Sequence, residues 1–377
     1  MKVYERISVS DILGDNLVYR DMQAMDTRLP RFAELSERAG WPGIAIPRKT
    51  SVEYAQIMVA LLEEAQRQRG LRVPIEKLVY VGDTRMNDGT AFTNIFNAGG
   101  WRGFAFIGSE SPQKVTVASQ EPSSAPIYYA NRWADLERFN AFLQARGLTI
   151  DEHTVVLIDL DKTLLGARGR NDKVIDRARV VAAHRTVEVL LGDDFDPESF
   201  KAAYDLFNQQ EYHPFTTDNQ DYLTYICLMV SAGLYGRDEL AEAVNAGRMA
   251  SFPQFIGEVA ERLAELPGNL RQVHGDVFVN VQKGDPTPFK AFRQNEFIVT
   301  TSWLGNLPDD APVERMLQEE IVLTQEVRLA AEAWKKQGAL LFSLSDKPPE
   351  ASVPTPEQRA EGYLAIHEIQ THAVGAD

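Results

Sequence analysis

The chain has 377 residues and 44% of them are hydrophobic, which is enough to build two domains or one domain with a large insert. Its formal charge of -15 argues against nucleic acid or anionic membrane as a partner, because the field of the protein repels both. The single cysteine, Cys227, cannot form an internal disulfide. With no apolar signal core and no apolar run of about 20 residues, we expect a cytoplasmic protein.

The first part of the chain predicts strands that alternate with helices. Residues 51–70 carry apolar side chains at helical spacing, with Ser51 placed as the N-cap and Gly70 as the stop. A short apolar run, 77–81, predicts a strand that ends in the polar turn GDTRMNDG. Further predicted elements are strands at 102–107, 127–130, 155–158 and 339–344, and helices at 133–146 and 313–337. This alternation is typical of a parallel sheet.

Between the last two strands most segments have helical periodicity. The predicted helices are 174–191, 197–210, 222–234, 239–246 and 253–266. No structure is predicted for 267–307, and 364–369 resembles a last strand. We therefore predict an α/β fold with a doubly wound, Rossmann-like parallel sheet and an inserted, mostly helical cap. The predicted domains are 1–165 and 313–377 for the core and 166–312 for the cap.

Two carboxylates follow the predicted strand 155–158. Alternation along an extended chain would send Asp159 and Asp161 to the same face, at the edge of the sheet where ligands bind in α/β proteins. Their mutual repulsion would be relieved by Mg²⁺, which prefers oxygen ligands and also neutralises phosphate. In GDTRMNDG, Gly82 suits a tight turn after a strand, and Asp83 and Asp88 offer further ligands.

Three segments resemble motifs of the haloacid dehalogenase-like (HAD) hydrolase superfamily. Asp159-Leu160-Asp161-Lys162-Thr163 is similar to its first motif, Asp-x-Asp-x-Thr, and Gly82 to Asp88 to its fourth. The strand that leads to Ser345, followed by Asp346-Lys347-Pro348, is similar to its second. The resemblance implies a HAD core with a cap domain.

The order of these motifs differs from that of the family, because the fourth motif precedes the first. One explanation is circular permutation, in which residues 43–147 correspond to the C-terminal half of such a fold. The alternative is a swapped homodimer, in which the N-terminal half of one chain completes the site of its neighbour. Both explanations bring the same residues together.

The resemblance also implies a role for each residue that matches. Asp159 would be the nucleophile that takes the phosphoryl group, and Asp161 the acid and base. Asp83, Asp88, Asp159 and the main-chain carbonyl of Asp161 would hold Mg²⁺. The remaining assignments are Ser345 to a phosphoryl oxygen, Lys49 to charge balance with Lys347 as the alternative, and Thr163, Arg168 and Lys347 to substrate binding.

Taken together, these features predict a Mg²⁺-dependent phosphohydrolase that acts through an aspartyl phosphate. A cap of the predicted size would exclude water and select a small phosphorylated metabolite. A phosphotransferase or mutase would use the same residues. A non-catalytic binding protein on the same fold is the other alternative.

Overall fold

The computed structural model describes residues 1–113, 117–119 and 125–376. The chain divides into two compact units, Met1–Asp176 with Thr300–Asp377, and Arg177–Val299. The second unit starts later and ends earlier than the segment 166–312 that the sequence suggested, and the residues on either side of it belong to the first unit. Among the described residues, no helix is both long and apolar enough to cross a membrane.

The first unit is built on a seven-stranded sheet with the order β2-β9-β7-β3-β4-β6-β5. Six strands are parallel, and β5 at the edge pairs antiparallel with β6. Their bounds are β2 Leu17–Val18, β3 Lys77–Gly82, β4 Arg102–Gly108, β5 Val117–Ser119, β6 Ile127–Ala130, β7 Thr154–Asp159 and β9 Leu340–Leu344. The predicted parallel α/β sheet is confirmed.

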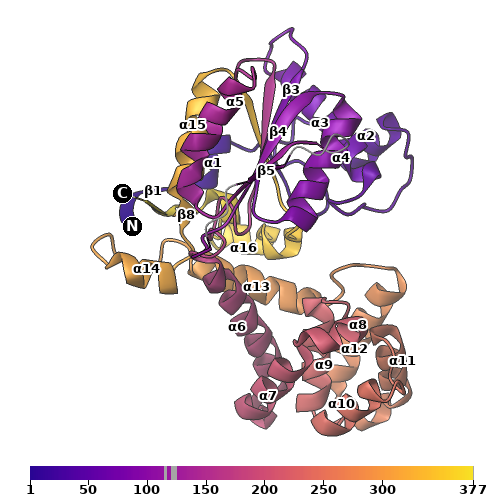
Figure 1. The fold of residues 1–377 in the computed structure, drawn as a ribbon. Coiled ribbons are helices and arrows are strands. Elements are labelled where there is room, and N and C mark those ends of the chain that lie inside the picture. Colours follow the sequence, from indigo (N-terminus) through magenta and orange to yellow (C-terminus); the bar gives the residue numbers. More distant parts are fainter. Residues whose placement is uncertain (114–116, 120–124, 377) are drawn as a thin grey trace. The chain divides into compact units, whose positions relative to one another are not determined.

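Helices cover both faces of this sheet, as in a doubly wound fold (Figure 1). On one face lie α1, α5 and α15, which pack on Val79, Val156 and their neighbours. On the other lie α2, α3 and α4, which pack on Leu78, Val155 and theirs. The bounds are α1 Val9–Leu13, α2 Phe32–Arg38, α3 Val52–Gln68, α4 Thr90–Gly99, α5 Leu136–Ala145 and α15 Gln325–Lys336. A strand buried on both faces is continuously apolar, which is the pattern of β7.

Local signals in the sequence explain where the longest of these helices begins and ends. The Ser51 hydroxyl accepts a hydrogen bond from the main-chain N–H of Tyr54 and caps α3, as predicted. Past the end of α3, Gly70 has φ +73°, and past α15 Gly338 has φ +104°, so both predicted stops are confirmed. The predicted helix 133–146 starts as a 3₁₀ turn, Trp133–Asp135, and continues as α5.

A small second sheet, β1-β10-β8, joins the two ends of the chain. Strand β1, Lys2–Ile7, pairs antiparallel with β10, Thr371–Gly375, and Lys2 lies opposite Gly375. Strand β8, Leu323–Thr324, pairs parallel with β10. The two termini are therefore close together, which Figure 1 also shows. Other short elements of this unit are η1 Arg85–Gly89, α14 Val313–Glu319, η6 Pro349–Ala351, α16 Pro356–Ala360 and η7 Ile366–Glu368.

The second unit consists of helices. They are α7 Pro197–Phe207, α8 His213–Thr216, α9 Gln220–Ser231, α10 Arg237–Asn245, α11 Phe252–Glu261 and α12 Gly268–Gln282, together with most of α6 Asp172–Leu191 and α13 Lys290–Ser302 and with short 3₁₀ turns at Gly192–Asp194, Gln210–Tyr212 and Leu263–Glu265. Its core includes an ion pair between Arg293 and Asp221, both buried. Segment 267–307, for which the sequence predicted no structure, forms α12 and α13.

Two predictions for the C-terminal part are wrong. The stretch 313–337 is two helices, α14 and α15, separated by β8. The break is made by long-range contacts: the buried carboxylate of Glu320 accepts hydrogen bonds from the main-chain N–H groups of Leu307 and His372. The predicted strand 364–369 contains a 3₁₀ turn instead, and the strand itself begins at Thr371.

Candidate active site

Three neighbouring strands of the sheet, β9, β7 and β3, end side by side and carry the residues singled out in the sequence. Strand β7 ends at Asp159, β3 ends at Gly82 just before Asp83, and β9 ends one residue before Ser345. The register pairs Ile158 with both Val81 and Ser343. These strands are parallel, so their carboxyl ends form one edge, where α/β proteins bind ligands.

Lys49 lies at the centre of this edge. Its Nζ donates hydrogen bonds to Asp159 Oδ1 at 2.5 Å and to Asp88 Oδ1 at 2.8 Å. The lysine side chain is 2% exposed, and Asp88 and Asp159 are buried as well. Lys49 comes from the segment before α3, so the structure brings together residues 110 positions apart in the chain. An ammonium group buried between two carboxylates is costly to desolvate, and removal of any one of the three groups would leave an uncompensated buried charge.

Asp88 is held by five hydrogen bonds. Its Oδ1 accepts from Lys49 and from the hydroxyl of Tyr80 at 3.0 Å. Its Oδ2 accepts from the N–H groups of Asp83 and Thr84 and from the Thr84 hydroxyl, at 3.0 to 3.1 Å. Since two carboxylate oxygens offer about four lone pairs, Asp88 has little capacity left for a metal ion. Its contacts fit the positioning of Lys49.

The turn that carries Asp88 explains Gly82. Residues Arg85–Gly89 form one turn of π-helix that leads into α4. This turn folds Asp88 back onto the end of β3, and a Cβ at Gly82 would lie 2.5 Å from the Asp88 Cβ. Gly82 does not have a positive φ. The sequence suggested Gly82 for a tight turn, but the structure requires a glycine there for close packing.

Asp159 is fixed by both of its oxygens. Oδ1 accepts from Lys49, and Oδ2 accepts from the Thr163 hydroxyl at 3.0 Å. The chain turns sharply between them, since Lys162 has φ +64°. Thr163 is completely buried. The sequence assigned Thr163 to substrate binding, and the structure instead uses its hydroxyl to orient Asp159.

Asp83 pairs with an arginine from the loop after β7. Nε of Arg168 lies 2.5 Å from Asp83 Oδ2, and the side chains are 36% and 7% exposed, respectively. Asp83 also lies beside two of the carboxylates described above, because one oxygen each of Asp83, Asp88 and Asp159 lie within 4.8 Å of one another. Arg168 therefore contacts the carboxylate cluster itself.

Of the remaining predicted residues, Ser345 and Lys347 follow strand β9, and Asp161 follows strand β7. Ser345 is buried, and its hydroxyl accepts a hydrogen bond from the Lys347 N–H at 3.1 Å. Ser343, the alternative, donates to the Ile158 carbonyl within the sheet. Asp161 is half-buried, and no described residue donates a hydrogen bond to its carboxylate. It stands outside the cluster of three.

Burial and charge strongly shift the pKa values of this cluster. Burial lowers the pKa of Lys49, but the Asp159 and Asp88 carboxylates raise it more, to well above its usual value. Burial and the Asp88 charge raise the pKa of Asp159 well above its usual value, against the effect of Lys49. Burial also acts to raise the pKa of Asp88, but Lys49 and the surrounding hydrogen bonds lower it on balance. Burial and Asp88 raise the pKa of Asp83 to about 7, although Arg168 opposes this.

The charges and donor atoms of the cluster fit a hard divalent cation. When all groups are ionised, Asp83, Asp88 and Asp159 carry three negative charges, and Lys49 and Arg168 carry two positive ones. Burial first, and the neighbouring Asp88 carboxylate second, raise the pKa values of Asp83 and Asp159, and a bound cation would offset both effects. Carboxylate oxygens are the ligands that Mg²⁺ prefers, and Asp83 and Asp159 have fewer competing contacts than Asp88.

Sequence reasoning missed Tyr80 and Thr84, which both hold Asp88. A signal for Tyr80 was present, because its hydroxyl is the one polar side-chain group in the interior of the strand sequence KLVYVG. A buried tyrosine hydroxyl needs a hydrogen-bond partner. Because Tyr80 stands two residues before the end of its strand, that partner is expected at the ligand-binding edge of the sheet. Thr84 carries no such signal beyond its place in the turn.

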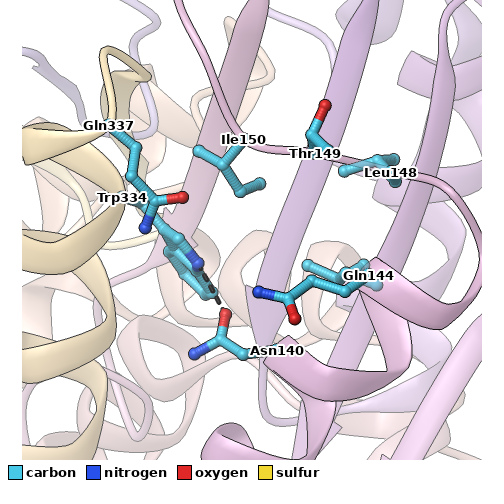
Figure 2. Close-up of a pocket in the computed structure, with 8 residues that line it drawn as sticks. Asn140, Gln144, Leu148, Thr149, Ile150, Trp334 and Gln337 are labelled. Atoms are coloured by element: carbon cyan, nitrogen blue, oxygen red, sulfur yellow. Dashed lines mark hydrogen bonds between the residues drawn. The ribbon is translucent and has the colours of Figure 1, made fainter.

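A hollow at the opposite edge of the sheet lacks the groups for acid–base catalysis (Figure 2). It has a volume of about 440 Å³ and lies between α5, α15 and the loop before β7. Nε1 of Trp334 donates a hydrogen bond to Asn140 Oδ1 at 2.7 Å there. Its lining is Asn140, Leu143, Gln144, Leu148, Thr149, Ile150, Trp334 and Gln337. None of these side chains is ionisable, so the carboxyl edge of the sheet is the better candidate for an active site.

Comparisons with known proteins found no match: no protein-family model, no curated protein and no solved structure matches this chain. The function must therefore be argued from the residues at the carboxyl edge of the sheet.

Proposed function

We propose that the protein is a Mg²⁺-dependent phosphohydrolase that acts on a small phosphorylated metabolite through an aspartyl phosphate. The observation that carries the proposal is Lys49 Nζ, buried 2.5 Å from Asp159 Oδ1 at the carboxyl edge of the sheet. A carboxylate with a fixed ammonium group beside it is suited to attack an anion, since the ammonium group offsets the negative charge of both partners. The resemblance of Asp159 to Thr163 to the first motif of HAD-like hydrolases supports the same role.

Each step uses residues of this chain. A carboxylate oxygen of Asp159 attacks the phosphorus, a bond from phosphorus to Asp159 forms, and the bond to the leaving oxygen breaks. Asp161 donates a proton to that oxygen. Asp161 then takes a proton from a water molecule that attacks the phosphorus, and Asp159 leaves as a carboxylate. Ser345 would donate its hydroxyl hydrogen to a phosphoryl oxygen.

The acids of the cluster have different roles in this proposal, because the Asp88 carboxylate already accepts five hydrogen bonds. Asp83 and Asp159, with the main-chain carbonyl of Asp161, would hold Mg²⁺, while Asp88 holds Lys49 in place. When bound, the cation would neutralise phosphoryl oxygens and keep Asp159 ionised. Thr163 fixes the second oxygen of Asp159 and so determines which way the carboxylate faces.

The test is release of phosphate from an aryl phosphate and from a panel of small phosphorylated metabolites, with Mg²⁺ and with EDTA. We expect Mg²⁺-dependent hydrolysis, and a fall of about a thousandfold or more in kcat for Asp159→Asn. Asp151→Asn is the matched control. Asp151 precedes the same strand and pairs with Lys77 at its opposite end, so this variant should keep its activity.

The result can contradict the proposal in two ways. If Asp159→Asn hydrolyses the best substrate as fast as the wild type, Asp159 is not the nucleophile. If phosphate passes to an added alcohol in preference to water, the protein is a phosphotransferase with the same site.

A further inference from the structure

Arg168 pairs with Asp83, whose carboxylate would bind the cation in the proposed function. Its Nε donates a hydrogen bond to Asp83 Oδ2 at 2.5 Å. The Asp83 side chain is 7% exposed, whereas the arginine side chain is 36% exposed. The carboxylate is thus fixed in the site, and the guanidinium reaches it from the solvent side.

The main chain around Arg168 is held firmly. Its carbonyl oxygen accepts hydrogen bonds from the Glu110 N–H at 2.8 Å and from Trp133 Nε1 at 3.2 Å, and its own N–H donates to the Lys162 carbonyl. The next residue, Gly169, has φ +77°, and a Cβ there would lie 2.0 Å from the main-chain oxygen of Glu110. The side chain of Arg168 can therefore leave Asp83 only by rotating about its own bonds.

A divalent cation on Asp83 would compete with the guanidinium of Arg168 for the negative charge of that carboxylate. The Arg168 hydrogen bond uses a lone pair of Oδ2, and two positive charges a few ångströms apart repel each other. In the absence of a cation, Arg168 partly compensates the negative charge of the cluster. Once a cation is bound, this charge is no longer needed on Asp83.

We propose that Arg168 pairs with Asp83 in the metal-free protein and is displaced from it when Mg²⁺ binds. The displaced guanidinium then binds the phosphate of the substrate. This inference rests on the proposed function. It assigns an order to binding, because the guanidinium becomes available to the phosphate only after the cation has taken Asp83. Guanidinium groups bind phosphate oxygens well through paired hydrogen bonds.

The experiment measures two affinities by calorimetry on the full chain. Mg²⁺ is titrated into wild type and Arg168→Gln, and inorganic phosphate is then titrated into the Mg²⁺-saturated proteins. We expect Arg168→Gln to bind Mg²⁺ roughly threefold to tenfold more tightly, because a competitor is gone. The same variant should bind phosphate roughly tenfold more weakly.

Arg85→Gln is the matched control. Arg85 is exposed on the turn between Asp83 and Asp88, its guanidinium faces the Tyr129 ring, and it forms no ion pair with a described carboxylate. This variant removes the same charge from the same edge of the sheet, so both of its affinities should stay near the wild-type values. Tighter Mg²⁺ binding in Arg85→Gln as well would mean that only the net charge matters, and would overturn the inference.

The other outcomes separate this inference from the proposed function. If Arg168→Gln binds Mg²⁺ as tightly as the wild type or more weakly, and the wild type binds it clearly, then Mg²⁺ does not displace Arg168. The proposed phosphohydrolase function is unaffected by that result. Unchanged phosphate affinity in Arg168→Gln overturns the transfer of the guanidinium to the substrate. Absence of Mg²⁺ binding in every variant overturns the cation site itself and, with it, this inference.

Discussion

At the scale of single residues, the site depends on one lysine between two acids. Both Lys49 and Lys347 follow apolar segments, and either could supply the positive charge as far as the sequence shows. The structure places Lys49 between Asp88 and Asp159. Sheet order does not distinguish the two lysines, since β3 and β9 are both neighbours of β7. The choice of Lys49 is made by side-chain contacts between segments far apart in the chain. Sequence spacing contains no information of this kind.

Protonation of Asp83 should control cation binding. Its pKa is raised to about 7 in the metal-free protein, from the usual value of 3.8. Below pH 7 the group carries a proton that Mg²⁺ must displace, so the apparent affinity should fall by up to about tenfold for each pH unit from 7 to 5. The raised pKa of Asp159 acts in the same direction. Above the pKa of Asp83, its contribution to the pH dependence disappears.

Calorimetry between pH 5.5 and 8, in buffers of different ionisation enthalpy, measures both the affinity and the protons released. Proton release on Mg²⁺ binding at pH 6 is the expected result. The effect on folding has the opposite sign to that of a typical carboxylate: between about pH 4 and 7 the native state binds a proton that the unfolded state does not. In the metal-free protein Asp83 therefore contributes less stability as the pH rises. An Mg²⁺ affinity independent of pH in this range would contradict the assignment.

At the scale of elements, the turn after β3 determines whether Lys49 is held. The Gly82→Ala variant would place a Cβ 2.5 Å from the Asp88 Cβ, so the π-helical turn must move and Asp88 must shift away from Lys49. We expect kcat for an aryl phosphate to fall by about a hundredfold, since a displacement of about 1 Å can cost that much. Steady-state kinetics measure this effect.

The matched control for this change is Gly257→Ala in α11. An added Cβ meets no atom within 4 Å there, and alanine is the better helix former, so activity should be unchanged and stability equal or slightly higher. Wild-type kcat in a folded Gly82→Ala protein would show that close packing of Asp88 is not needed for catalysis.

The same elements show where sequence reasoning succeeds. Strands β3, β7 and β9 are predictable because each is a short, mostly apolar run, and such runs are typical of strands buried on both faces. Asp83 and Asp159 could also be placed at one edge, since that follows from parallel strands alone. The sequence predicts a glycine at position 82 for a tight turn, whereas the structure needs it because Asp88 packs against it. That packing is a tertiary contact, which a local sequence pattern does not show.

The break between α14 and α15 illustrates the same limit. The spacing of apolar residues from 313 to 337 suits one helix. The chain leaves the helix at Glu320 because β8 pairs with β10, some 50 residues later. The buried carboxylate of Glu320 meets His372 and Thr371 there, which local periodicity cannot show.

At the scale of the whole molecule, the order of the segments along the chain matters. Residues from the first part of the chain, Lys49, Asp83 and Asp88, meet Asp159 within one polypeptide. Strands β1 and β10 pair, so the two termini lie close together, as a circularly permuted fold requires. We propose a permuted monomer as the arrangement of the proposed active site, with a swapped dimer as the alternative.

Mixing two inactive chains tests this arrangement. Asp83→Asn and Asp159→Asn are unfolded together in equal amounts, refolded, and assayed for hydrolysis of the best substrate. In a permuted monomer every site keeps one of the two substitutions, so no activity should return. In a swapped dimer, random exchange would restore about a quarter of the sites, because half of the dimers are mixed and one of their two sites has both acids. Light scattering on the same sample gives the mass. Recovered activity at the mass of a dimer would mean that two chains build each site, and the contacts of Lys49 with Asp159 would then join neighbouring chains.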